Sequence, residues 1–244
     1  MTRKNIAAAS AAFVLGSTLV CACATTAPEP PRSITISHPD LGADVVIVGD
    51  GVFVFIALPA AHARLQEAAL QLRETTTIIV HDDVYAFVKA TGQTAPSLRA
   101  WSTFKTVHLL PPSTWSDPGP IAANKRLAHE LCHVALWQAH GSEAEAVQAR
   151  LPRFVVEGVC SVVADQGDAR QPREEVLELA RAGRTVNFDD DAAFSYGFAH
   201  HVFAAVLACR GWPGIKAVVD DVGTAGVVGA LGKSPLQWLE EPCP

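Results

Sequence analysis

The sequence has no run of basic residues and no long uninterrupted apolar segment. Its 19 Lys and Arg are outnumbered by 25 Asp and Glu, so the formal net charge is −6. A negative chain without a basic patch is not expected to bind nucleic acid, or to attach to a membrane surface by charge. No internal repeat stands out. With 244 residues, the expectation is one domain, or at most two small lobes, preceded by a processing segment.

Residues 1–23 are expected to be that processing segment, outside the folded domain. Arg3 and Lys4 precede an apolar stretch, residues 6–20, which is too short and too rich in Ala and Ser for a convincing membrane span. The following residues, VCAC, resemble a bacterial lipobox with Cys23 as the acylated residue. The alternative is an ordinary cleaved signal peptide. The first interpretation predicts a lipid-anchored protein on the periplasmic side of the cell envelope, and the second a secreted one.

The mature chain is expected to begin with a Pro-rich tether, residues 24–33, followed by one domain, residues 34–244. Outside the cytoplasm its remaining cysteines can form disulfides. Four cysteines allow three pairings. One hypothesis is that two helices are stapled together by one disulfide and the C-terminal tail is tied down by another. The pairs would then be Cys132 with Cys160, and Cys209 with Cys243.

Residues 129–133 read HELCH and are the most informative part of the chain. They lie in residues 121–140, a stretch without Pro or internal Gly that Gly141 can end as a helix. Two His four residues apart share one helix face, so both imidazoles can reach one zinc ion at about 2.0–2.1 Å. Glu130 would project beside the metal, where it can act as a general base. The alternative is a chance pair of half-exposed His with a surface Glu.

A catalytic zinc commonly keeps three protein ligands, so a third donor is needed from another element. Residues 151–165, LPRFVVEGVCSVVAD, can form a second helix that begins near Pro152. Glu157 lies among apolar residues there, and burying a lone carboxylate is unfavourable unless it is paired or liganded. Residues 141–150 can turn the chain back, so that this helix packs beside the first and presents Glu157 to the metal.

Together, residues 129–133 and residues 152–158 (PRFVVEG) resemble the gluzincin zinc metallopeptidases. The likeness is greatest to the compact peptidase MA-like domains of bacterial envelope proteins, and it spans about residues 75–240. Phe154 stands where Trp is usual, and the 23-residue spacer before Glu157 is longer than in the large aminopeptidases of the superfamily. The resemblance implies a thermolysin-like minimal catalytic fold with one Zn²⁺ per chain. It further implies His129, His133 and Glu157 as ligands and Glu130 as the base.

The expected fold class is α+β, with a small sheet among mixed elements first and helices later. Strands are predicted at residues 33–37, 44–48, 52–57, 76–80 and 105–110, with Gly49-Asp50-Gly51 as a hairpin turn. Helices are predicted at residues 60–74, from Asp82 or Asp83 to near Gly92, and at 121–140, 151–165, 172–182, 192–210, 213–222, 224–231 and from 235 onward. The resemblance also implies that residues 105–110 form an edge strand that pairs with an extended substrate.

Peptide hydrolysis develops an oxyanion that benefits from a further electrophile, usually Tyr or His in these enzymes. Tyr196 is the candidate, with His200 one turn beyond it. The alternatives are a core or rim aromatic and a packing histidine. Tyr85 is expected in the core. Asp165 and residues 189–191 are the candidates for carboxylates that orient the ligand His rings. They can equally be helix caps and loop charges.

The sequence therefore predicts a zinc-dependent peptidase that hydrolyses peptide bonds of a peptide or protein substrate in the cell envelope. One alternative is a non-catalytic envelope lipoprotein, a binding module that retains a zinc site as a structural element. Another is a zinc amidohydrolase that acts on a non-peptide amide. Intact ligands and an intact base favour an enzyme over the binding module.

Overall fold

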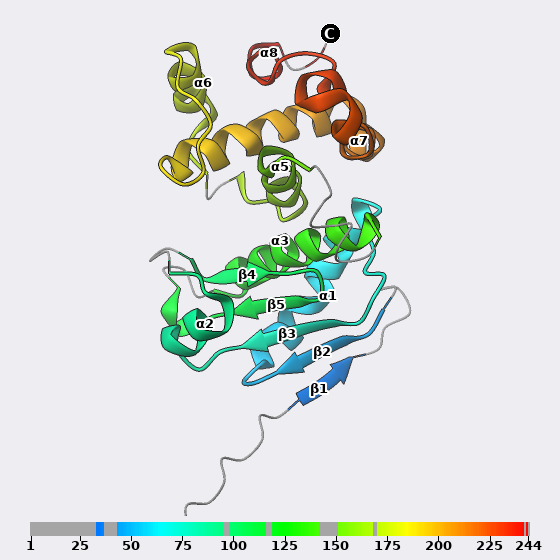
Figure 1. The fold of residues 1–244 in the computed structure, drawn as a ribbon, viewed down its shortest axis with the longest axis vertical. Helices are drawn as coiled ribbons and strands as arrows, with labels where there is room; N and C mark the ends of the chain where they lie inside the picture. The colour runs from blue at the N-terminus through cyan, green and yellow to red at the C-terminus, as the bar shows by residue number, and fades with distance from the viewer. Residues whose placement is uncertain are drawn as a thin grey trace, which may run out of the picture. The chain divides into compact units, whose positions relative to one another are not determined.

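The computed structural model describes residues 33–36, 43–94, 98–115, 119–141, 151–167, 170–241 and Cys243. In this part of the chain the fold is α+β, as predicted, with a small sheet first and helices afterwards (Figure 1). The predicted signal segment with Cys23, the tether before Ser33 and most of the connection at residues 141–150 lie outside the described residues.

The sheet has five short strands in the order β1-β2-β3-β5-β4. Their bounds are Ser33–Ile36 (β1), Val45–Val48 (β2), Thr76–Val80 (β3), Ala100–Ser102 (β4) and Thr106–Leu109 (β5). β2, β3 and β5 run parallel, whereas the two outer strands pair antiparallel with their neighbours. The carboxyl ends of the three parallel strands therefore share one edge of the sheet, and the helices that follow them begin there.

The strand predicted at residues 52–57 is wrong, because the first helix, α1 (Val52–Glu67), begins at this point. Its buried residues follow the helical period and not strand alternation: Val54, Ala57, Leu58, Ala61 and Leu65. The predicted hairpin is wrong for the same reason. Gly49 has φ 93, and a Cβ there would lie 2.3 Å from the carbonyl oxygen of Val80. The chain thus turns tightly out of β2 into a helix, and burial of the apolar face overrides local β propensity.

The predicted edge strand at residues 105–110 is an inner strand. β5 pairs with β3 on one side and with β4 on the other, so its backbone groups are already used. Among the described strands the outer one on this side is β4, a three-residue element that the sequence does not predict. An extended substrate therefore cannot pair with residues 105–110, and β4 provides the edge instead.

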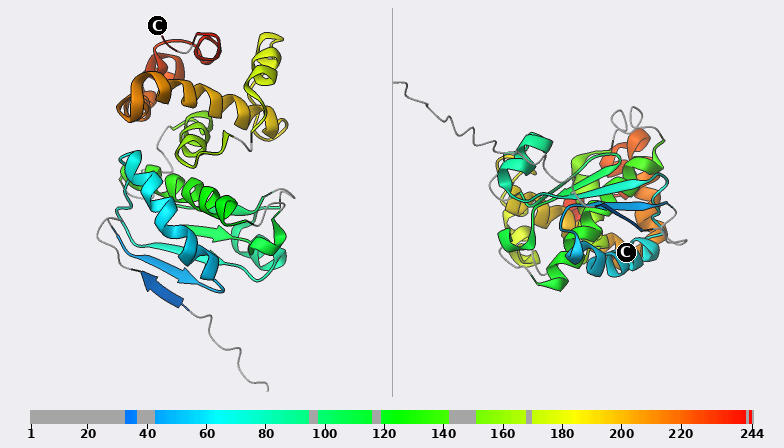
Figure 2. Two further views of the ribbon diagram at one scale, coloured as in Figure 1. Left: turned by 180° about the vertical axis from the view of Figure 1, so that it is seen from behind. Right: turned by 90° about the horizontal axis from the view of Figure 1, so that it is seen from below.

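Helices α1 and α3 (Pro120–Ala139) pack side by side on one face of the sheet (Figure 2). α2 (Val84–Thr91) connects β3 to the β4–β5 pair. It begins with the Asp83 side chain accepting a hydrogen bond from the Ala86 N–H and ends at Gly92 with φ 70. A single-turn 3₁₀ helix, η2 (Pro112–Thr114), precedes α3.

The second half consists of α5 (Arg153–Val163), α6 (Arg173–Arg181), α7 (Ala192–Leu231) and α8 (Pro235–Glu240). α5 packs against both α3 and α7. α7 is broken at Gly211, where the sequence predicts a stop, and at Gly226, two residues after the predicted start of the next helix. A capping box at Ser234 begins α8. The phenylalanines Phe194, Phe198 and Phe203 on the first part of α7 are buried in the core.

Of the helices in the described ranges, α7 is the one whose length and composition would allow it to cross a bilayer. It is interrupted at Gly211 and Gly226, and its first part is packed against α5. An apolar helix of this kind equally suits the core of a domain, which is where its buried side chains place it.

Cys209 and Cys243 form the predicted disulfide, which ties the end of the chain to α7. The other predicted pair is not bonded. Cys132 on α3 and Cys160 on α5 are buried free thiols whose Sγ atoms lie 2.6 Å apart. The two helices thus meet where the pairing hypothesis placed them, through contacting thiols and not through a disulfide.

Candidate metal centre

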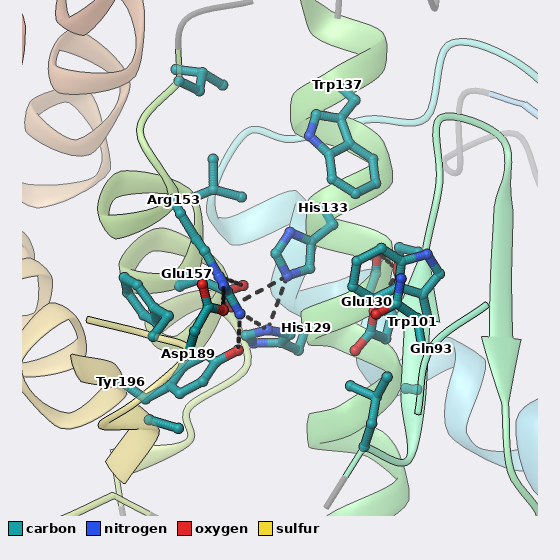
Figure 3. A pocket seen from close by; sticks show the side chains of 17 residues that line it. Gln93, Trp101, His129, Glu130, His133, Trp137, Arg153, Glu157, Asp189 and Tyr196 are labelled. Carbon is teal, nitrogen blue, oxygen red and sulfur yellow. Dashed lines mark hydrogen bonds and ion pairs between the residues drawn. The ribbon is translucent and has the colours of Figure 1, made fainter. Parts of the chain in front are cut away.

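Two histidines on α3 and one glutamate on α5 converge at the contact between these helices (Figure 3). His129 and His133 are four residues apart, and their Nε2 atoms lie 3.0 Å from each other. The Glu157 Oε2 atom lies 3.3 Å from Nε2 of His129 and 3.6 Å from Nε2 of His133. All three side chains are buried. The structure thus brings together the three residues predicted as ligands.

The spacing of these atoms fits a metal ion. Ligands at about 2.0–2.1 Å from a tetrahedral zinc are separated from one another by about 3.3 Å. The three distances in the cluster, 3.0, 3.3 and 3.6 Å, are centred on that value. Two imidazoles and a carboxylate are also a donor set that suits zinc and other first-row metals. The residues present therefore fit a metal ion.

The electrostatics of the cluster point the same way. Burial alone would raise the pKa of Glu157, but His133 and His129 beside it hold that pKa well below its usual range. Burial alone would lower the pKa of His133, but the Glu157 carboxylate raises it to about 9. A buried carboxylate is thus stabilised by positive charge next to it. A divalent cation can supply the same charge.

The predicted carboxylate partners of the two ligand rings are elsewhere. Asp165 pairs with Arg64 and Lys125, and the acidic residues 189–191 pair with Arg153, Asn187 and Arg184. Among the described residues, the Nδ1 atoms of His129 and His133 have no hydrogen-bond partner. These carboxylates are paired charges away from the ligand rings, and Asp191, at the N-cap position of α7, makes no capping hydrogen bond with its side chain.

Glu130 is buried beside the cluster and is held by a residue that sequence reasoning missed. The Ser102 hydroxyl donates a short hydrogen bond to Oε2 of Glu130 and also lies 3.2 Å from the Glu130 carbonyl oxygen. Ser102 belongs to β4, so the outer strand supports the predicted base. No sequence signal identifies this residue, because a serine in a three-residue strand has no distinguishing pattern.

Tyr196 from the second turn of α7 faces the same cavity, and Arg153 at the start of α5 lies over it (Figure 3). The Tyr196 hydroxyl is 3.5 Å from Nη2 of Arg153. Nη1 of Arg153 donates to Asp189 at 2.9 Å, and its Nε lies 3.7 Å from Oε1 of Glu157. Burial and the nearby Glu157 raise the pKa of Tyr196, so its phenol stays protonated and can donate. Arg153 was part of the recognised motif, but the sequence assigned it no role.

The cluster lies in a cavity of about 740 Å³ between α3, β4, α5 and the start of α7. This volume is typical of small-molecule and peptide-side-chain sites. One wall is polar, with Arg153, Asp189 and Tyr196, and the other is aromatic, with Trp101 and Trp137. The three predicted ligands therefore face a cavity large enough to hold a small molecule.

His200 and Tyr85, which the sequence also singled out, lie outside the cavity. His200 is buried and its Nδ1 lies 3.0 Å from the Ser161 hydroxyl, so it is a packing histidine and does not line the cavity. Tyr85 is 77% exposed, and its expected place in the core is wrong. His108 on β5 is half-buried and contacts His81, with 2.9 Å between its Nδ1 and Nε2 of His81.

No family model matches the chain, and none of the curated proteins is similar to it at a significant level. The geometry of the site and the two sequence motifs are therefore the basis on which a function can be proposed.

Proposed function

We propose that the protein is a zinc-dependent peptidase of gluzincin type with a thermolysin-like catalytic fold. The observation that carries the proposal is the convergence of His129, His133 and Glu157 on one point in the cavity. Glu130 lies next to the first ligand in the sequence. A structural zinc site is normally closed by four protein ligands, whereas three ligands facing a cavity leave a position for substrate chemistry.

His129, His133 and Glu157 would hold the zinc ion, which when bound supplies a Lewis acid and increases the acidity of water. Glu130 would take the proton from the attacking water and return it to the leaving amine. The hydrogen bond from Ser102 occupies Oε2 of Glu130 and fixes the carboxylate, so that Oε1 remains to accept the proton. The chain thus provides a positioned base as well as a ligand set.

Tyr196 and Arg153 would stabilise the negative charge that develops on the carbonyl oxygen. A protonated phenol and a guanidinium that face one cavity are suitable hydrogen-bond donors for an oxyanion. Their 3.5 Å separation allows both to reach one oxygen atom. The Arg153–Asp189 ion pair would hold the guanidinium over the cavity in the absence of substrate.

The substrate would be a peptide in extended conformation along β4. This strand is the outer one on its side of the sheet, in the ranges that the structure describes, and Trp101 and Ser102 on it line the cavity. An exposed strand edge is a template for an added strand, whose side chains then alternate between the cavity and solvent. The aromatic wall favours an apolar side chain near the cleaved bond.

The first test is the zinc content of the purified protein and of its Glu157→Ala variant. One zinc per wild-type chain and a large loss in the variant are expected. Glu130→Gln should keep zinc and lose hydrolysis of peptides. A well-folded wild-type protein without zinc would overturn the proposal. Zinc without hydrolysis of any peptide would instead favour the binding module or the hydrolase of non-peptide amides.

We also propose that the protein lies on the periplasmic side of the envelope, anchored by a lipid on Cys23. The support is the basic start, the short apolar stretch and the lipobox-like residues 20–23. Mass spectrometry of the N-terminal peptide tests this directly. An unmodified Cys23, or cleavage elsewhere, would mean that the protein is secreted without an anchor.

A further inference from the structure

Large apolar side chains are exposed near the N-terminal ends of the three α-helices α1, α2 and α3. Six of them, each between 54 and 77% exposed, form what we call the apolar rim. The rim consists of Val52, Phe55 and Ile56 on α1, Val84 and Tyr85 on α2, and Ile121 on α3. Single exposed apolar residues are ordinary on a protein surface, but a group of them at the same end of three helices is not.

The topology places all six at one edge of the sheet. α1 follows β2, α2 follows β3, and α3 comes after β5. These three strands are parallel neighbours, so their carboxyl ends, and the helix starts that follow, lie at the same edge (Figures 1 and 2). The rim is therefore a feature of one end of the sheet and not a scatter of unrelated positions.

The tether leaves the domain at this same edge. β1 is antiparallel to β2, and its first residue, Ser33, pairs with Val48, the last residue of β2. Val52 follows only four residues after Val48. Cys23 lies ten residues before Ser33, a stretch that spans at most about 35 Å when fully extended. A membrane that held a lipid on Cys23 would thus lie within reach of the rim.

We propose that the apolar rim docks into the surface of a lipid bilayer that holds the N-terminus through Cys23, an inference that rests on the lipid anchor proposed above. Apolar side chains gain free energy when they leave water for the acyl boundary, and Tyr85 suits the interface because its ring is amphipathic. Asp50 and Asp82 are exposed beside the rim, so anionic lipid would repel it. The attraction is therefore hydrophobic, and a neutral phosphatidylcholine surface suffices.

Docking of the rim would fix the orientation of the site. His129 lies eight residues beyond Ile121 on α3, about 12 Å along the helix axis. The cavity would then be held close to the membrane. What this means for substrates rests on the proposed peptidase function, whereas docking of the rim does not. The substrates would then be polypeptide segments that emerge near the bilayer surface.

The test uses the full chain, processed in a bacterial host and purified with its lipid. Single cysteines at the rim, Phe55→Cys, Tyr85→Cys or Ile121→Cys, carry a polarity-sensitive dye. Val228→Cys is the matched control, because Val228 is 56% exposed on α7, outside the rim. Among the described residues the free cysteines, Cys132 and Cys160, are buried and escape labelling, and Cys23 has no free thiol once it carries the lipid. The protein is placed in phosphatidylcholine vesicles with and without spin-labelled lipid.

The expected result is a blue shift and lipid quenching at the three rim positions and neither at position 228. Solvent-like emission at all three rim positions of the anchored protein would overturn the proposal, as would equal quenching at position 228. A blue shift that appears without lipid and depends on protein concentration would mean that the rim contacts a second copy of the chain instead of the bilayer. Recovery of the protein in the soluble fraction with an unmodified Cys23 would also overturn the docking proposal. Zinc content and hydrolysis of a soluble peptide are independent of these outcomes.

Discussion

At the scale of single residues, the site combines side chains that the sequence marks with side chains that only the fold brings in. His129, Glu130, His133 and Glu157 stand in two recognisable motifs. Ser102 does not, yet it donates a hydrogen bond to the predicted base. The protein therefore offers tests in which a ligand, a base and a supporting residue are changed separately.

Replacing Ser102 by alanine is expected to lower kcat for peptide hydrolysis by about 10–100-fold, since outer residues that orient a site contribute by that order. Zinc content should not change, because Ser102 contacts no ligand atom. Ser161→Ala is the matched control: Ser161 is also a buried, hydrogen-bonded serine, but its partners are His200 and Arg170. Steady-state kinetics and metal analysis of both variants check this. Equal losses of kcat in Ser102→Ala and Ser161→Ala would show that Ser102 has no specific role in supporting Glu130.

Tyr196→Phe is expected to lower kcat by about 10–100-fold with little change in KM, because a donor to a developing oxyanion acts chiefly in the transition state. Tyr85→Phe serves as the control, since Tyr85 is exposed and lines no part of the cavity. The measurement is kcat and KM for one peptide. An unchanged kcat in Tyr196→Phe would leave Arg153 as the oxyanion donor.

At the scale of elements, the candidate metal cluster depends on how closely α5 packs between α3 and α7. Gly158 follows the predicted ligand Glu157, and a Cβ on it would lie 2.3 Å from the buried Phe203 ring of α7. The small residue therefore lets the two helices approach. Strand pairing also positions residues of the site, because β4 places Ser102 at the cavity.

Gly158→Ala is expected to lower the free energy of unfolding by about 1–3 kcal/mol, because a methyl group inserted into a packed core displaces its neighbours. Zinc binding should weaken with it, since Glu157 moves with α5. Gly223→Ala on α7 is the control: a Cβ there meets nothing within 4 Å, and alanine should be neutral or stabilise by up to about 1 kcal/mol. Urea unfolding of both variants distinguishes a packing effect from a general effect of removing glycine. A stable Gly158→Ala variant would contradict the close approach.

The contact between His81, at the end of β3, and His108 on β5 should make stability depend on pH. Burial and the neighbouring His81 lower the pKa of His108 to about 4, and burial lowers that of His81 despite Asp82 and Asp83. The unfolded chain, with an ordinary His pKa, binds these protons first as the pH falls. The free energy of unfolding should therefore decrease from about pH 6.5 towards pH 4.

The decrease from this pair is expected to be roughly 1–2 kcal/mol, smaller than the full pKa change implies because His108 is only half-buried. His108→Gln should flatten the dependence in that range. Denaturant unfolding at a series of pH values, compared between wild type and variant, measures the difference. Parallel curves for the two proteins would show that the pair does not titrate on unfolding.

At the scale of the whole molecule, the candidate metal cluster joins two parts of the fold that follow one another in sequence. Two of its residues come from α3, which packs on the sheet, and one comes from α5, the first helix of the helical half. A metal ion bound there would stabilise the folded state against the unfolded state by mass action.

Removal of metal with a chelator is accordingly expected to lower the thermal midpoint of the wild-type protein. At a free zinc concentration about 100 times the dissociation constant, the stabilisation is about 2.7 kcal/mol. Glu157→Ala, which lacks a ligand, should show little response to chelator or added zinc. Differential scanning calorimetry with and without chelator is the measurement. Identical midpoints in the wild-type protein would mean that no ion binds in the folded state.

The sequence by itself determined the elements whose signals are local. Side chains within a few residues specify the helix with HELCH, the helix that begins after Pro152 and the stop at Gly211. They also specify a cap at Asp82 or Asp83, of which the structure uses Asp83. The spacing of His129 and His133 on one face follows from the helical period alone. The ligand set was therefore predictable, because its members belong to such elements.

Only the tertiary structure decided what depends on long-range contacts. Residues 52–57 have strand-like composition but form a helix, because α1 buries its apolar face against the sheet and α3. The order of β4 and β5 follows from pairing across the sheet, which made the predicted edge strand an inner one. Ser102 beside Glu130, Arg153 beside Tyr196 and the thiol contact of Cys132 with Cys160 exist for the same reason. Side chains distant in sequence become neighbours when the elements pack, and local pattern does not encode that packing.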